Sequence, residues 1–153
     1  MSKSNSRKES FLGKFQVFSV DSISGKFLKP LSFNFQFFDN SQSCGQDFKD
    51  WTQEQLFRLL DKLKEYSKLT MVELISQKTL VIYGDFPNPS DFTHPRHIPI
   101  DVKWGRFRLE GDCRLCGFIV NEVPGINQNT FKPNIFYVVF LDAFHKFYRM
   151  EKS

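Results

Sequence analysis

The feature that most constrains the fold is NIFYVVFLD, at residues 134–142, because both of its faces are apolar. In a strand, successive side chains point to opposite faces, so the apolar residues divide into two sets. One set is Ile135, Tyr137, Val139 and Leu141, and the other is Phe136, Val138 and Phe140. A strand with two apolar faces must be covered on both sides, so we expect it to be central in a sheet or covered by helices.

Strands are also predicted at the N-terminal end of the chain. LSFNFQFFD, at residues 31–39, alternates apolar and polar residues, which indicates a half-buried strand. Phe15, Val17 and Phe18 suggest an earlier strand, and SISG lies in the turn between the two. We therefore expect an N-terminal β-hairpin. The chain holds 19 Phe, and this abundance favours β structure and an aromatic core.

Two helices are predicted after this hairpin. Thr52 with Gln55 forms a capping box, and leucines follow it at helical spacing, so we expect a helix over 52–67. The leucines are Leu56, Leu59, Leu60 and Leu63. Thr70 with Glu73 is a second capping box, which opens a short helix to about Ser76. Such a helical hairpin must bury its leucine face on the sheet.

The remaining segments predict an antiparallel meander. TLVIYG at 79–84 is typical of a short strand, whereas four prolines within 85–99 exclude regular structure there. VKWGRFRLE at 102–110 and CRLCGFIVN at 113–121 are strand-like and are joined by a Gly-Asp turn. The expected fold is one α+β domain over 11–153, with an antiparallel sheet packed against a helical hairpin. The first ten residues, 1–10, are basic and polar, and we expect a flexible arm.

Charge and hydropathy set the class of partner that we expect. The net charge is +4, and residues 94–153 contain nine Lys or Arg against six Asp or Glu. A basic surface attracts polyanions such as nucleic acid, although a solvated lysine-rich surface explains the charge equally well. No window is long and apolar enough for a membrane span, and the first residues lack the apolar core of a signal peptide. With three Cys, we expect no disulfide framework and a cytoplasmic protein.

The strand over 102–110 carries the first candidate site. Period two places Trp104, Arg106, Arg108 and Glu110 on one face, which we expect to be exposed. Two arginines beside a tryptophan can hold phosphates and stack on an unpaired base. The alternative is a solvated face with a cross-strand Arg–Glu pair. Arg114 lies just past the turn, where it either joins a shared cationic cluster or extends to solvent at the sheet edge.

The second candidate site follows the apolar strand. Asp142, His145, Lys146 and Tyr148 lie within seven residues. Histidine transfers protons near neutral pH, and a tyrosine hydroxyl can donate a proton or a hydrogen bond that orients the substrate. His145 and Tyr148 share a face if the chain turns after Asp142, and otherwise they belong to a fraying terminus.

The sequence contains no convincing motif for binding a metal or a cofactor. Cys113 and Cys116 have the spacing of a zinc ligand pair, but in a strand their side chains point in opposite directions. We therefore interpret them as core residues and expect no metal. The sequence has no Gly-rich phosphate loop, no GxSxG and no HExxH, so we expect no cofactor either.

The combination of a helical hairpin, WGRFRLEGDCRLCGFIV and FYVVFLDAFHKFY resembles the RelE/YoeB superfamily of toxin ribonucleases, over residues 52–148. The resemblance implies a RelE-like fold with the N-terminal hairpin as an addition. It also implies cleavage of messenger RNA, commonly on the ribosome, by attack of a ribose 2′-hydroxyl on the adjacent phosphate without a metal. A neutralising antitoxin protein is the implied partner.

The resemblance also implies roles for individual residues. Arg106 or Arg108, with Arg114, would hold the phosphate, and His145 would transfer the proton. The remaining roles are a carboxylate base for Glu110, stacking on or orienting the base for Tyr148, and electrostatic assistance for Lys103. Trp104 and Lys146 are further expected RNA contacts. Two alternatives stay open: a non-catalytic RNA- or protein-binding module of the same fold, and a stress or immunity protein that dimerises through its Phe-rich sheet.

Overall fold

The computed structural model describes residues 29–149, which form an α+β fold with five strands in one mixed sheet. The strands are β1 (Ser32–Asn34), β2 (Leu80–Gly84), β3 (Lys103–Arg108), β4 (Arg114–Ile119) and β5 (Ile135–Asp142). The helices are a 3-10 turn, η2 (Phe48–Asp50), and two α-helices, α3 (Gln53–Tyr66) and α4 (Met71–Ser76). The prediction of an α+β fold is confirmed.

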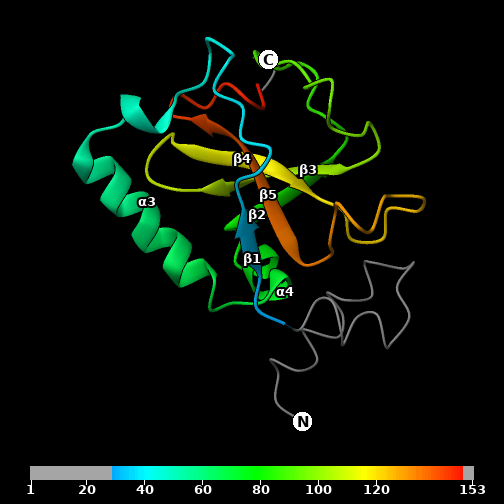
Figure 1. The fold of residues 1–153 in the computed structure, drawn as a ribbon. Coiled ribbons are helices and arrows are strands. Elements are labelled where there is room, and N and C mark those ends of the chain that lie inside the picture. The colour runs from blue at the N-terminus through cyan, green and yellow to red at the C-terminus, as the bar shows by residue number, and fades with distance from the viewer. Residues whose placement is uncertain (1–28, 150–153) are drawn as a thin grey trace.

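The strands lie in the order β1-β5-β4-β3-β2. β2, β3, β4 and β5 pair antiparallel in sequence order, whereas β1 runs parallel to β5, so the expectation of an antiparallel sheet is wrong at β1. β5 is therefore paired with a strand on each side. This is the central position in the sheet that we expect for a strand with two apolar faces. Figure 1 shows the sheet from its β1 edge, with α3 on one side of it.

Both predicted helices are present and begin where their capping boxes place them. The Thr52 hydroxyl accepts from the Gln55 N–H, and the Thr70 hydroxyl accepts from the Glu73 N–H. The expected leucine face is wrong at Leu60, which is 64% exposed. Leu59 and Leu63 face the sheet, and Leu60 lies about 100° around the helix axis from Leu59. Neither helix of residues 29–149 is long and apolar enough to cross a membrane.

Each face of the sheet has its own apolar cluster. On one face, α3 and α4 pack against residues such as Phe107, Leu115 and Phe136. On the other face, the proline-rich loop 85–101 and the loop 120–133 cover residues that include Trp104 and Phe118. These loops lie across the sheet from α3 in Figure 1. The sheet is thus buried on both faces, by helices on one and by loops on the other.

The segment 31–39 departs from the expected long strand, because β1 contains three residues. The Asn34 side chain accepts from the Gln36 N–H at 2.8 Å, and this Asx turn ends the strand. After the turn, Phe37 packs on Phe118, in the cluster on the loop-covered face. The predicted flexible arm, 1–10, and the first strand of the predicted N-terminal hairpin lie outside the described residues.

Candidate functional site

Strands β3 and β4 bring together three arginines, Arg106, Arg108 and Arg114, which we call the arginine cluster. Arg108 and Arg114 are directly paired across the two strands, and Arg106 is paired with Cys116, the residue two positions after Arg114. Residues paired in this way have side chains on the same face of the sheet, which here is the loop-covered face. The shared cationic cluster anticipated from the sequence is therefore present in the structure.

Arg114 is the most enclosed member of the arginine cluster, with an exposed fraction of 6%. Its Nη1 donates to the carbonyl oxygens of Gly111, at 2.7 Å, and Cys113, at 3.0 Å, which fixes the guanidinium against the β3–β4 turn. Burial lowers the pKa of Arg114, and the positive charges of Arg106 and Arg108 lower it further. This position therefore carries a positive charge that its surroundings disfavour.

The arginine cluster has no carboxylate partner among residues 29–149. The ion pairs described there involve Arg58 and Arg149 instead. The Nε and Nη1 atoms of Arg106 and the Nε of Arg114 are buried without a hydrogen-bond acceptor. Asp112 acts on Arg114 electrostatically without forming an ion pair, so the cluster retains donors that an anion can satisfy.

Two tyrosines lie beside the arginine cluster. The rings of Tyr83 and Tyr148 are stacked, with centroids 4.6 Å apart and planes 15° from parallel. Burial raises the pKa of Tyr83, and the charge of Arg106 together with a side-chain hydrogen bond from it partly offsets this effect. Tyr148 is 41% exposed, so part of its surface remains open. The tyrosine pair thus places an aromatic surface next to the cations.

Tyr83 is a site residue that the sequence analysis missed. It belongs to β2, where the register shifts between Ile82 and Gly84. An extra residue in one strand changes which way the side chains point, and period-two alternation gives no sign of it. The only sequence signal was an aromatic hydroxyl in a strand that pairs with the arginine-bearing strand.

The chain turns sharply after Asp142. The Asp142 carboxylate, which is fully buried, accepts from the N–H groups of Lys146, at 2.9 Å, and Phe147, at 2.8 Å. Burial raises the pKa of Asp142, whereas these two hydrogen bonds and the charge of His145 lower it. His145 itself has a positive φ of 58°, which belongs to this turn. The turn returns Phe147 to the core and Tyr148 to the Tyr83 ring.

His145 lies beside Asp142 at the end of β5, on the strand next to Arg114. Arg114 and Asp142 are paired residues of β4 and β5. However, no hydrogen bond or ring contact among the described residues joins His145 to the arginine cluster. Of the two alternatives left open by the sequence, the turn after Asp142 is the one present, and it places His145 near the same end of the sheet as the cluster.

Two predicted site residues, Glu110 and Lys103, lie away from the arginine cluster. Glu110 follows the end of β3 and forms an ion pair with Arg58 of α3 at 2.5 Å, on the helix side of the sheet. The expectation of a continuous strand face that includes Glu110 is wrong, because β3 ends at Arg108. Lys103 alternates with Trp104 and therefore faces away from Arg106.

Trp104 is fully buried, so the exposed face predicted for it is wrong. Rings from the proline-rich loop and the C-terminal turn surround it, namely Phe86, His94 and Phe147. Lys146, the last predicted contact residue, places its Nζ 5.8 Å from the centre of the Phe144 ring. The loop over 85–101 accounts for the burial of Trp104, and a strand pattern alone does not predict such a cover.

The cysteines have structural positions. Cys116 is buried in the cluster on the loop-covered face, and the Cys113 thiol lies 3.7 Å from the Ala143 carbonyl oxygen. Burial raises the pKa of both thiols. Within the described part of the chain, no group of three or more His, Cys, Asp or Glu is arranged to hold a metal ion.

Comparison of the chain with protein-family models, with curated proteins and with solved structures finds no match. The chemistry of the site therefore has to be argued from its geometry.

Proposed function

We propose that this protein binds single-stranded RNA at the arginine cluster and cleaves it as a RelE-like endoribonuclease, acting as a toxin or phage-defence effector. The observation that carries the proposal is the set of three neighbouring arginines with no carboxylate partner in residues 29–149. A phosphodiester would supply the missing negative charge and accept from the planar guanidinium groups. The exposed part of Tyr148 offers a surface for the adjoining base.

The proposed reaction needs no bound metal. The ribose 2′-oxygen loses its proton and attacks the adjacent phosphorus, the bond from phosphorus to the 5′-oxygen breaks, and that oxygen gains a proton. The products are a 2′,3′-cyclic phosphate and a free 5′-hydroxyl. Arg106 and Arg114 would stabilise the charge that develops on the phosphorane oxygens, and His145 would transfer a proton.

The order of elements supports the RelE-like part of the proposal. A helical hairpin precedes an antiparallel meander, and the arginines and the His145–Tyr148 segment occupy one end of the sheet. This is the combination on which the resemblance rests. Under the proposal, messenger RNA is the substrate, and a neutralising antitoxin protein covers the basic end of the sheet.

A second candidate function is that of a non-catalytic RNA-binding module. Its support is the position of Glu110, which is held by Arg58 on the helix side and leaves the arginine cluster without a carboxylate base. In that case the cluster binds phosphate, and His145 has no chemical role.

The test measures RNA binding and RNA cleavage separately. Binding of a fluorescein-labelled single-stranded RNA is followed by anisotropy over a range of salt concentrations. We expect Arg106→Met and Arg114→Met each to weaken binding and to reduce the slope of log K against log salt by about 0.7, the value for one phosphate contact on a single strand. Arg58→Met, an exposed arginine on the helix side, is the matched control and should leave the slope unchanged.

Cleavage is measured with an end-labelled RNA in the presence of a chelator, for wild type and His145→Ala. The endoribonuclease proposal requires cleavage by wild type, loss of cleavage in His145→Ala with binding retained, and no cleavage of an RNA with a 2′-deoxy residue at the scissile position. Binding without cleavage in wild type indicates the second candidate. An unchanged salt slope in both cluster variants rejects RNA binding at this site.

A further inference from the structure

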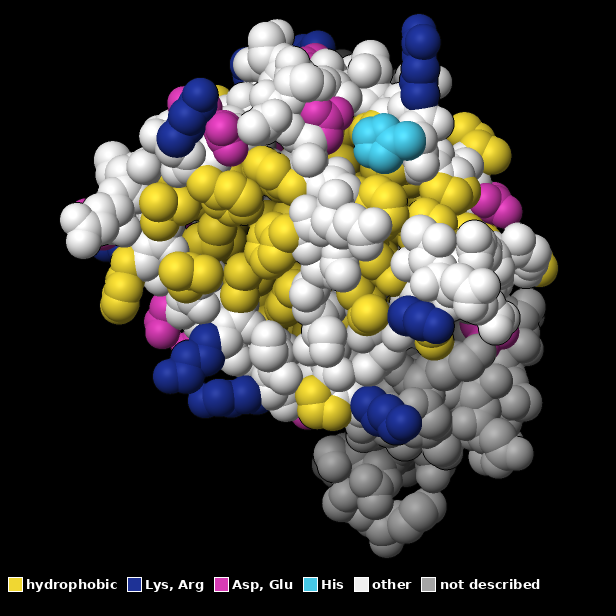
Figure 2. Space-filling view, viewed as in Figure 1, with side chains coloured by type: hydrophobic (Ala, Val, Ile, Leu, Met, Phe, Trp, Pro, Cys, Tyr) yellow, Lys and Arg dark blue, Asp and Glu magenta, His cyan; other side chains and the backbone are white. Residues whose placement is uncertain are grey.

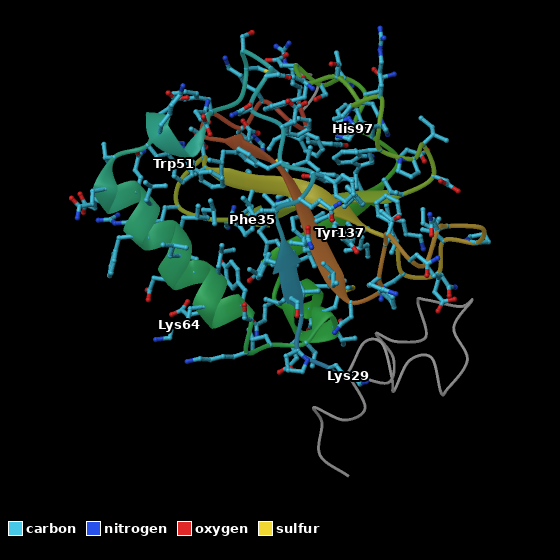
Figure 3. The ribbon with its side chains drawn as sticks, viewed as in Figure 1. Lys29, Phe35, Trp51, Lys64, His97 and Tyr137 are labelled. Carbon is cyan, nitrogen blue, oxygen red and sulfur yellow. The ribbon has the colours of Figure 1, made fainter. Side chains whose placement is uncertain are left out.

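The free edge of the sheet carries an open apolar groove. It lies between β1 and α3, has a volume of about 530 Å³, and is lined by residues that include Phe33, Phe35, Leu60, Leu63 and Lys64. We call it the β1 groove. Figure 2, which looks onto this edge, shows a broad hydrophobic area between the positions of α3 and β1 in Figure 1. Figure 3 shows Phe35 in this area, with Lys64 on α3 and Lys29 near the foot of β1.

Large apolar side chains are left open at the β1 groove and next to it. Leu60 is 64% exposed and Phe35 is 39% exposed, and on α3 the neighbouring Phe57 is 68% exposed. Contiguous apolar surface of this kind commonly marks an interaction site. No other described segment covers the groove.

The backbone at this edge is paired at its start, where the Leu31 N–H donates to the Leu69 carbonyl oxygen and Pro30 forms a bridge with Thr70, but it is unpaired at Phe33. The Ser32 N–H donates to the Asn134 carbonyl oxygen on the β5 side of β1. Successive peptide groups of a strand point in opposite directions, so the N–H and C=O of Phe33 point away from β5. No described residue forms a hydrogen bond with either group. Beyond the pairing with Leu69 and Thr70, the edge of β1 can therefore accept a short extended segment at Phe33, and natural sheets rarely leave such an edge unprotected.

We propose that the β1 groove is covered by the protein's own residues 11–20, FLGKFQVFSV, added as a strand along β1. The chain preceding Lys29 comprises 28 residues, and it enters the described fold three residues before β1 begins. Residues 21–28 form a connection that is long enough to reverse the direction of the chain. Residues 11–20 can therefore reach the groove without another helix or strand in between.

The sequence of this segment matches the groove. Phe15 and Val17 alternate with Gln16, so an extended backbone presents apolar side chains to one side. Six strand residues span about 20 Å, the usual length of a strand. Its backbone would pair with the free groups of Phe33, while its side chains would cover Leu60 and Phe35. This proposal is independent of the RNA site, which lies at the other face of the sheet.

The test is amide hydrogen exchange of the full chain, read over residues 15–20. We expect exchange at least about tenfold slower than that of an unstructured peptide, and a return to the unstructured rate in Leu60→Asp. Leu60 is exposed, so this substitution leaves the core intact. Ile100→Asp is the control, because Ile100 is 78% exposed and does not line the β1 groove. The reciprocal change, Phe15→Asp, should speed exchange at Phe33 by a similar factor.

Unprotected amides at 15–20 in the wild-type chain overturn the proposal. Protection that survives Leu60→Asp also overturns it, because the segment then docks elsewhere. Protection that grows with protein concentration, together with a dimer in light scattering, assigns the groove to a second copy of the chain and likewise overturns it.

Discussion

Arg114 and Asp142 face each other as paired residues of β4 and β5, and both are buried, yet they do not form an ion pair. The Arg114 guanidinium donates to the carbonyl oxygens of Gly111 and Cys113, whereas the Asp142 carboxylate accepts from the backbone of Lys146 and Phe147. Each charge is therefore held by backbone groups. As a result, the carboxylate shapes the C-terminal turn without neutralising the cation that faces the candidate site.

The Asp142→Asn substitution tests the role of this carboxylate in the turn. Each carboxylate oxygen of Asp142 accepts a hydrogen bond from one backbone N–H, whereas Asn has only one acceptor oxygen. The amide NH₂ of Asn would therefore face a backbone N–H that has lost its acceptor. We expect the free energy of unfolding at neutral pH to fall by about 1–3 kcal/mol, the cost of leaving a buried group unsatisfied. Urea denaturation measures it. Asp91→Asn, which removes an exposed ion pair with Arg149, should change the stability by less than about 1 kcal/mol.

Asp142 also predicts a pH dependence. Burial raises the pKa of Asp142 above its ordinary value of 3.8, so the folded state binds this proton more tightly than the unfolded state does. Its contribution to the free energy of unfolding is therefore greatest below pH 3.8 and declines as the pH rises through the raised pKa. Asn cannot titrate. The stability of wild type relative to Asp142→Asn should thus fall between about pH 3 and the raised pKa, and a difference that rises over this interval would contradict the assignment.

Arg106→Met separates stability from function. The Nε and Nη1 of Arg106 are buried without acceptors, and the charge is repelled by Arg114. Met removes a charge that no carboxylate balances, but it also removes the side-chain hydrogen bond between Arg106 and Tyr83, so we expect the free energy of unfolding to change by no more than about 1 kcal/mol. Affinity for the labelled RNA should nevertheless fall. A loss well above about 1 kcal/mol on urea denaturation would mean that Arg106 has a structural role beyond its hydrogen bond with Tyr83, and the cluster would lose its interpretation as a binding site.

The sequence predicts the fold better than it predicts the site, for a physical reason. Capping boxes at Thr52 and Thr70 and the two apolar faces of residues 135–141 are local patterns, and the structure follows each of them. Proximity of Arg114 to Arg106 and Arg108 also follows from a local pattern, the tight turn between their strands.

The errors in the site come from events that break periodicity. β3 ends two residues before Glu110, so the carboxylate turns to Arg58. A register shift in β2 aims Tyr83 at the cluster, and the proline-rich loop encloses Trp104. Bulges, strand ends and covering loops depend on contacts between distant segments, which alternation along one strand does not encode.

Glu110→Gln tests whether Glu110 acts as the base for cleavage. The carboxylate forms an exposed ion pair with Arg58, which contributes at most about 1 kcal/mol to stability. We therefore expect RNA cleavage at the wild-type rate and a small decrease in the midpoint of urea unfolding. A folded Glu110→Gln variant that no longer cleaves would instead show that Glu110 reaches the substrate when RNA is bound.

Gly117→Ala tests the close approach of β4 and β5. A Cβ at Gly117 would overlap the carbonyl oxygen of Tyr137, next to the register shift at Cys116 and Gly117. Because the obstacle is backbone, relief requires the two central strands to separate, and we expect a loss of several kcal/mol or failure to fold. Gly111→Ala is the matched control: its φ is +54°, nothing lies within 4 Å of the added Cβ, and the expected cost is about 1 kcal/mol. Thermal unfolding of both variants measures the difference, and equal effects would show that the strands accommodate the methyl group.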